Sequence, residues 1–173
     1  MIKFVSNKTL VRALAACMMA AVLAGCGFQL RGSGGQYNLP FHSIWLSFNE
    51  ASPLGTELKR NLRAGDSVRI ETDASKAEAL FDVLSEARGK SILSLNSLGR
   101  VREYSLSYTL VFQVRDANNR QLLAPTEITL RRNIAFDESQ VLAKESEEAL
   151  LYRDMQSDLV QQIMRRLAAV KPQ

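Results

Sequence analysis

The most regular pattern in this chain is an alternation of apolar and polar side chains between residues 104 and 114. A period of two residues is typical of a strand that buries one face and leaves the other polar. The polar positions are mostly serine and threonine, which suit a solvated sheet face. The buried face of this strand is expected to consist of Tyr104, Leu106, Tyr108, Leu110, Phe112 and Val114.

Shorter alternating or apolar stretches predict the other strands of the same sheet. Gly89-Lys90 has the composition of a turn and is expected to lead into residues 91–98. A second turn is expected from Asp116 to Asn119, because Asp and Asn readily form tight turns. The predicted strands cover residues 41–48, 67–71, 79–88 and 126–136.

A period of about four residues predicts two helices. In the first, Ser52-Pro53 supplies the N-cap and the first helical position, and Gly65 marks the end. The second helix is long, with Asp137 as its expected N-cap and Gln140 completing a capping box. We expect its apolar stripe to pack in the core along its whole length: Leu142, Ala149, Tyr152, Leu159, Val160, Ile163 and Leu167.

These elements predict an α+β fold, with a mainly antiparallel sheet of four or five strands and two helices packed on one face. The first two strands and the helix between them form a unit that suits a parallel crossover. Residues 40–173 are expected to fold as a single α+β sandwich domain. A domain of this size buries enough apolar surface to be stable without disulfides.

Residues 1–25 have the features of a secretory signal peptide. Lys3, Lys8 and Arg12 precede an apolar run of roughly 12 residues, which is shorter than the 20 or so that a membrane span needs. The run ends in Leu23-Ala24-Gly25-Cys26, which resembles the lipobox of bacterial lipoproteins. The alternative is an ordinary cleaved signal beside an incidental cysteine.

The lipobox resemblance implies that Cys26 carries the lipid anchor. Gly27 follows Cys26 in place of the Asp that tends to retain such lipoproteins at the inner membrane. We therefore expect a lipid-anchored protein on the periplasmic face of the outer membrane. Residues 26–39 include a glycine-rich stretch from Gly32 to Gly35, which suits a lipidated tether.

Composition argues against most catalytic chemistry. The formal charge of +4 falls to about +1 when Lys3, Lys8 and Arg12 leave with the signal, so the net charge does not indicate a nucleic-acid partner. His42, the only histidine, is expected to be a surface or strand-edge residue, and the chain has no Gly-x-Ser-x-Gly motif. We predict no catalytic residues, metal site or cofactor.

Basic residues beside apolar ones are the remaining candidates for a binding site. Arg100 and Arg102 flank Val101, Arg131-Arg132 lie in the last predicted strand, and Lys144 lies early in the long helix. One interpretation is that these side chains are solvated and form weak surface ion pairs. The other is an anion site, because guanidinium groups match phosphate oxygens in pairs.

An ordered set of short stretches resembles the LPS-assembly lipoprotein LptE family, although no single stretch is diagnostic. The likeness covers nearly the whole chain after the lipobox. The stretches are GFQLRG at Gly27 to Gly32, REYSL at Arg102 to Leu106, a Pro125 turn before Ile128 to Arg132, Ala143-Lys144-Glu145, and IMRRL at Ile163 to Leu167.

This resemblance implies a non-enzymatic protein that plugs the lumen of the LptD β-barrel, binds lipopolysaccharide and assists its assembly at the cell surface. Lys144 matches a family position associated with lipopolysaccharide contact. A second basic family position falls on Ser97, so the resemblance leaves Arg100 or Arg102 to replace it. The alternatives are a lipoprotein accessory of a different envelope assembly or transport complex, and an envelope hydrolase that uses carboxylates.

Overall fold

The computed structural model describes residues 37–65 and 68–171. The chain divides into two units, Met1–Gly35 and Gln36–Gln173, and the fold below is that of the second unit. The predicted signal peptide, Cys26 and most of the tether lie outside the described residues, so their roles remain predictions.

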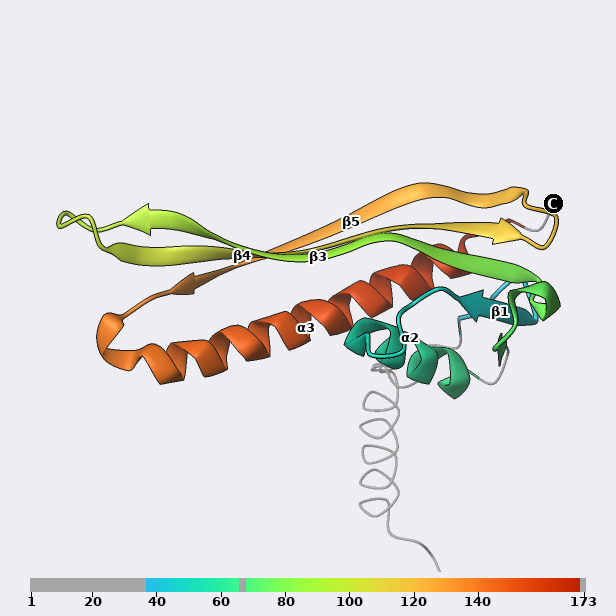
Figure 1. Ribbon diagram of the computed structural model, residues 1–173, viewed down its shortest axis with the longest axis horizontal. Coiled ribbons are helices and arrows are strands. Elements are labelled where there is room, and N and C mark those ends of the chain that lie inside the picture. The colour runs from blue at the N-terminus through green and yellow to red at the C-terminus, as the bar shows by residue number, and fades with distance from the viewer. Residues whose placement is uncertain (1–36, 66–67, 172–173) are drawn as a thin grey trace, which may run out of the picture. The chain divides into compact units, whose positions relative to one another are not determined.

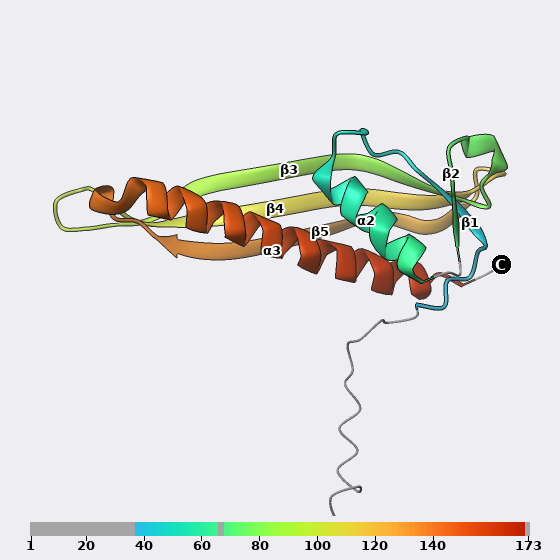
Figure 2. The ribbon, with the colours of Figure 1, turned by 90° about the horizontal axis from the view of Figure 1, so that it is seen from below.

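The second unit contains a five-stranded sheet in the order β2-β1-β3-β4-β5. Two helices, α2 and α3, lie on the same side of this sheet (Figures 1 and 2). The bounds of the elements are β1 Ser43–Leu46, α2 Pro53–Ala64, β2 Arg69–Glu71, the 3-10 turn η1 Ala74–Lys76, β3 Ala79–Leu95, β4 Val101–Asp116, β5 Gln121–Ala135, the 3-10 turn η2 Glu138–Gln140, and α3 Val141–Ala168.

The strand directions confirm the predicted α+β class. The three long strands β3, β4 and β5 pair antiparallel. β1 pairs parallel with both β2 and β3, so β1, α2 and β2 form the expected parallel unit. β1 and β2 are shorter than the patterns at 41–48 and 67–71 suggested.

The turn predicted at Gly89-Lys90 is wrong, because β3 continues through it without a break. Gly89 pairs with Ser107 and Lys90 with Leu106. Gly89 lies directly opposite Ser107, and a Cβ at this position would lie 2.6 Å from the Ser107 Oγ unless that hydroxyl moved. The chain reverses farther on, where Asn96 N donates to Arg100 O over 2.8 Å.

β5 begins five residues before the predicted strand and contains Pro125 inside it. The expected turn at Pro125 is therefore also wrong. Proline is accommodated because β5 is an edge strand and its register shifts here, with Phe112 opposite Thr126 and Val114 opposite Leu123. The turn from Asp116 to Asn119 forms as predicted.

α2 forms as its sequence predicts. Gly55 N donates to the Ser52 Oγ over 3.1 Å, which makes Ser52 the N-cap. Gly55 also lets the helix approach the segment after β1 closely, because a Cβ there would lie 2.7 Å from Phe48. The side chains at the predicted spacing are fully buried: Leu54, Leu58 and Leu62.

The core lies between the helices and the half of the sheet that contains β1. Phe48, Phe81 and Phe112 stack there, with ring centroids 5.6 Å and 4.7 Å apart along the series. The predicted buried face of β4 is confirmed from Leu106 to Val114, and Tyr104 is partly buried. α3 completes this core with Met155, Leu159, Val160, Ile163, Met164 and Leu167.

The start of α3 differs from its prediction. Asp137 caps the short turn η2, accepting from Ser139 N over 2.9 Å, and α3 begins at Val141. Gln140 stands at the N-cap position of α3 but makes no side-chain cap bond, so the predicted capping box does not form.

The apolar stripe of α3 is buried over only part of its predicted length. Leu159, Val160, Ile163 and Leu167 are buried and Tyr152 is half-buried, as expected. Leu142, however, is 80% exposed, and Ala149 is exposed as well. Figure 1 shows the reason: α3 diverges from the sheet toward its N-terminal end, and α2 lies over the other half.

Candidate functional site

The structure brings three of the basic candidates, Arg100, Arg102 and Lys144, to one end of the sheet, here called the hairpin end. It comprises the β3–β4 loop at residues 96–100, the start of β4, η2 and the first turns of α3 (Figure 1). Arg100 Nη1 lies 3.2 Å from the Glu138 carboxylate of η2. Phe136 N donates to the Arg102 backbone oxygen over 2.8 Å, which ties the end of β5 to the start of β4.

The three basic residues differ in how far their charges are already paired. The Lys144 ammonium lies 2.9 Å from Glu147, and its side chain is only 20% exposed. Arg100 is paired with Glu138 but remains 62% exposed. Arg102 is exposed and has no ion pair within residues 37–65 and 68–171. Arg102 therefore presents the most available charge of the three.

The chain around Lys144 is held by a local turn. Hydrogen bonds from the Ser139 backbone and side chain lower the pKa of Asp137, and the nearby Lys144 charge adds to this effect. Asp137 is thus a carboxylate at neutral pH and fixes the entry into α3. This geometry keeps Lys144 at the hairpin end.

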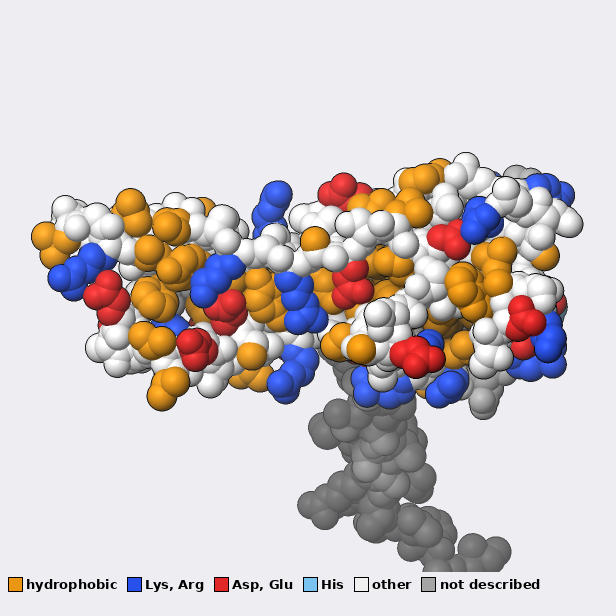
Figure 3. All heavy atoms as spheres, in the orientation of Figure 1, with side chains coloured by type: hydrophobic (Ala, Val, Ile, Leu, Met, Phe, Trp, Pro, Cys, Tyr) orange, Lys and Arg blue, Asp and Glu red, His pale blue; other side chains and the backbone are white. Residues whose placement is uncertain are grey.

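Exposed apolar side chains gather at the same end of the molecule. Figure 3 shows them interspersed with Lys and Arg side chains. Leu98 is 76% exposed and Leu142 80% exposed, which is unusual for leucine in a folded domain. The set consists of Ile92, Leu93, Leu95, Leu98, Val141, Leu142 and Leu150.

The patterns in the sequence did not predict this exposed apolar surface. The adjacent apolar pair Ile92-Leu93 could have indicated it. Consecutive strand residues point to opposite faces of a sheet, so the two side chains cannot both face one core. Because the helices cover only one face of this sheet, one side chain of such a pair is exposed on the other face.

Between the hairpin end and α2, a cleft of about 700 Å³ lies between β3 and α3. At its base the Arg88 guanidinium lies 4.5 Å from the centroid of the Tyr108 ring and 5.4 Å from that of Tyr152. Arg88 also donates to the Gln156 side chain over 3.2 Å. The cleft is lined by Pro53, Arg88, Lys90, Glu145, Glu148, Ala149, Tyr152, Arg153 and Gln156.

Hydrogen bonds fix the walls of this cleft. The Tyr108 hydroxyl donates to Glu86 over 2.6 Å, and burial together with this bond raises the pKa of Tyr108 to about 12. Lys90 lies 2.6 Å from Glu148, and that bond raises the pKa of Lys90. The Tyr152 hydroxyl donates to the Gly89 backbone oxygen, which links α3 directly to β3. Contacts across the cleft thus connect the β3–β4 hairpin to α3.

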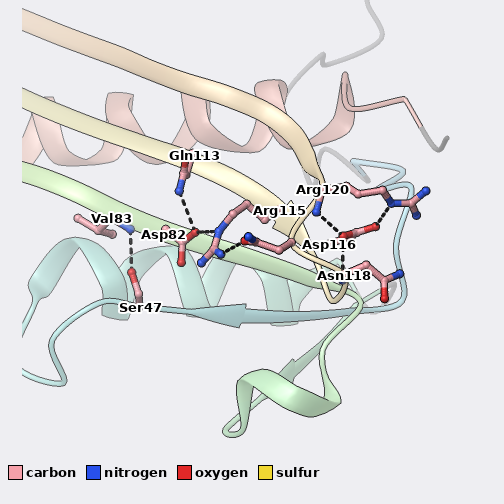
Figure 4. Close-up of polar contacts among 9 residues, drawn as sticks. Ser47, Asp82, Val83, Gln113, Arg115, Asp116, Asn118 and Arg120 are labelled. Carbon is pink, nitrogen blue, oxygen red and sulfur yellow. Dashed lines mark hydrogen bonds and ion pairs between the residues drawn. The ribbon is translucent and has the colours of Figure 1, made fainter.

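A separate polar cluster lies at the other end of β4 (Figure 4). Asp82 accepts from Arg115 over 2.5 Å and from Gln113 over 3.3 Å. Burial alone would raise the pKa of Asp116, but hydrogen bonds from Arg120 and Asn118 lower it. These contacts satisfy one another, so the cluster stabilises the β4–β5 turn.

The described residues offer little for catalysis. They contain no group of three or more His, Cys, Asp and Glu side chains placed to hold a metal ion. His42 is the surface residue predicted, 86% exposed with its Nδ1 3.4 Å from Glu78. No helix in the described part of the chain is long and apolar enough to cross a membrane.

Comparison with known proteins identifies the family. The family model described as LptE, lipopolysaccharide-assembly, matches residues 41–167. The chain belongs to the LptE family. It is similar to the LPS-assembly lipoprotein LptE of Pectobacterium atrosepticum, at 29% identity over 151 residues that cover 86% of this chain and 80% of that protein. The resemblance of the short sequence stretches to LptE is thereby confirmed.

Two solved structures show the same LptE fold. Lipoprotein B of Nitrosomonas europaea is 38% identical, with a TM-score of 0.70 over 83% of this chain and 91% of that one. The rare lipoprotein B of Shewanella oneidensis is 27% identical, with a TM-score of 0.65 over 74% of this chain and 95% of that one. Membership of the LptE family supports a role in lipopolysaccharide assembly and a location in the cell envelope.

Proposed function

We propose that this LptE family member is a non-enzymatic subunit of the lipopolysaccharide translocon. In this proposal it plugs an LptD-like outer-membrane β-barrel and binds lipopolysaccharide at the hairpin end. The lipid on Cys26 anchors it to the outer membrane on the periplasmic face. The observation that carries the proposal is the joint presence of Arg100, Arg102 and Lys144 with seven exposed apolar side chains at one end.

This combination suits an amphiphile that carries phosphate groups. The exposed leucines offer apolar contact to acyl chains, at about 25 cal/mol for each Å² removed from water. Arg102 offers a guanidinium fork to phosphate oxygens, and Arg100 can exchange its exposed partner Glu138 for a phosphate. Neither contribution requires a catalytic group.

A charge-reversal pair tests lipopolysaccharide binding. Arg102→Glu with Lys144→Glu in the full chain is expected to abolish detectable binding in a titration with purified lipopolysaccharide. Wild-type affinity should fall as salt rises, because exposed charges are screened over about 8 Å at physiological ionic strength. Arg60→Glu with Arg63→Glu, which reverses two exposed charges on α2, is the matched control. Equal affinity of wild type and the Arg102/Lys144 pair would remove these residues from the site.

Purification tests the barrel partnership separately. The tagged lipoprotein, extracted in mild detergent, is expected to bring an LptD-like barrel with it in stable association. Recovery of a different outer-membrane barrel would instead support an accessory role in another envelope complex. This result does not depend on the phosphate contacts, because a plug is held by its fit to the barrel wall.

Mass spectrometry tests the anchor. The mature protein is expected to begin at Cys26 and to carry both an acylated amino terminus and a diacylglyceryl group. Two attached lipids hold a protein firmly at a membrane, whereas one gives only reversible binding. An unmodified amino terminus on the mature chain would contradict this assignment.

A further inference from the structure

A second pocket lies at the end of the molecule opposite the hairpin end. It has a volume of about 370 Å³ and lies between the start of β5 and the last turn of α3. The lining contains two cations and no carboxylate. It consists of Leu122, Leu123, Thr126, Arg166, Ala169, Val170 and Lys171.

Arg166 is the unusual member of this lining. Its Nη1 atom is buried and has no hydrogen-bond partner, and no other buried side-chain nitrogen or oxygen in residues 37–65 and 68–171 is left in that state. A buried donor atom without an acceptor destabilises a folded protein, and such atoms are rare in native structures. Within the described residues, the Arg166 Nη1 atom is thus a hydrogen-bond donor without an acceptor.

Nearby carboxylates are engaged elsewhere. A smaller adjoining cleft shares Leu122, Val170 and Lys171 with this pocket, and it is also lined by Asp116 and Glu78. Asp116 accepts from Arg120 Nε over 2.6 Å, and Glu78 accepts from His42 N over 2.7 Å. An acceptor for Arg166 is thus expected from outside the described domain.

We propose that this pocket receives the carboxylate of an Asp or Glu side chain from the barrel partner, an inference that rests on the proposed function. The leucines and Val170 make part of the lining apolar, so a partner segment seated on them would displace water, and a charge-assisted bond is strongest where water is excluded. A single carboxylate suits the site better than a phosphate. The pocket lies at the C-terminal end of α3, where the helix dipole disfavours negative charge. This effect is smaller for a singly charged carboxylate than for a more highly charged phosphate.

The neighbouring Arg165 provides a matched control. It lies on the same helix turn and carries the same charge, but its side chain is exposed and does not line the pocket. Arg166→Met and Arg165→Met should be made in the full chain and compared for two properties. The first is the amount of barrel retained after mild-detergent purification, and the second is the melting temperature of the lipoprotein separated from the barrel.

We expect Arg166→Met to reduce barrel retention by about tenfold or more, the scale of a lost desolvated ion pair. Its melting temperature should stay the same or rise, because the variant removes a buried donor atom that makes no hydrogen bond. Arg166→Lys should retain an intermediate amount of barrel, since it keeps the charge but loses the guanidinium fork. Arg165→Met should behave like wild type in both measurements.

Four results would overturn the inference. Unchanged barrel retention by Arg166→Met would show that the partner does not use the pocket. A lower melting temperature would show that Arg166 stabilises the fold itself. Full barrel retention by Arg166→Met, combined with weaker binding when that variant is titrated with purified lipopolysaccharide, would assign the pocket to a phosphate. Wild-type protein that retains no barrel would overturn the proposed function, and the inference with it.

Discussion

The two halves of α3 have a similar apolar content but differ in what covers them. In the C-terminal half, Leu159, Ile163 and Leu167 are fully buried between the sheet and α2. In the N-terminal half, Leu142 and Leu150 are 80% and 54% exposed. An apolar stripe therefore shows which face of a helix can be buried. Whether that face is buried depends on the layers that pack against it.

The sheet shows the same division along β3. Phe81 lies in the core, where β1 pairs with β3 and α2 packs above. Beyond Leu84, β3 has lost its neighbour β1 and forms a long hairpin with β4 (Figure 1). One half of the domain thus contains the core, and the other presents an exposed apolar and basic surface.

The largest effect is expected from truncating the covered half of α3. Ile163→Ala should lower the free energy of unfolding by about 2 to 5 kcal/mol, because it leaves a cavity in a tightly packed core. Leu142→Ala should change it by less than about 0.5 kcal/mol, since Leu142 is exposed. Urea unfolding of both variants measures the difference. Equal losses would show that the N-terminal half is also buried in solution.

A smaller effect is expected where the two halves meet. Tyr152→Phe removes the hydrogen bond from its hydroxyl to the Gly89 backbone oxygen, which measures 2.7 Å. The free energy of unfolding should fall by about 1 kcal/mol. Tyr37→Phe, which removes an exposed bond to Gln161, is the control and should have less effect. If Tyr152→Phe were as stable as wild type, the hairpin would not depend on this link.

High pH should weaken the same junction. Because the folded protein raises the pKa of Tyr108 to about 12, the neutral phenol is favoured in the folded state. Its contribution is fully present below the unfolded pKa near 10 and is lost as the pH rises toward 12. Urea midpoints between pH 8 and 12 measure this loss. Tyr108→Phe should show a shallower decline, and an identical decline would assign it to other groups.

The smallest effect on stability is expected at the hairpin end, where binding should respond instead. Leu98→Ser should leave the free energy of unfolding within about 0.5 kcal/mol, because the side chain is 76% exposed. The same change should weaken lipopolysaccharide binding in a direct titration. If Leu98→Ser and Leu142→Ser both bound lipopolysaccharide normally, the two leucines would not take part in the contact, and the basic side chains alone would remain as candidates.

Local patterns in the sequence determined much of this protein. The alternation from Tyr104 to Val114 predicted β4, and the cap at Ser52 with leucines every fourth residue predicted α2. The α+β class and the shared side of both helices followed from these patterns, because each apolar face needs a covering layer. The LptE family was also recognisable from an ordered set of short stretches. Such a resemblance compares sequences directly and does not require knowledge of the packing.

Only the tertiary structure determined how long these elements are and what covers them. Gly89 has turn chemistry, yet it lies inside β3 because pairing with β4 continues through it. The exposure of Leu142 follows from the divergence of α3 from the sheet, and the orphaned Nη1 of Arg166 from the way β5 meets the end of α3. Such features depend on contacts between residues far apart in the chain, and no local pattern records them.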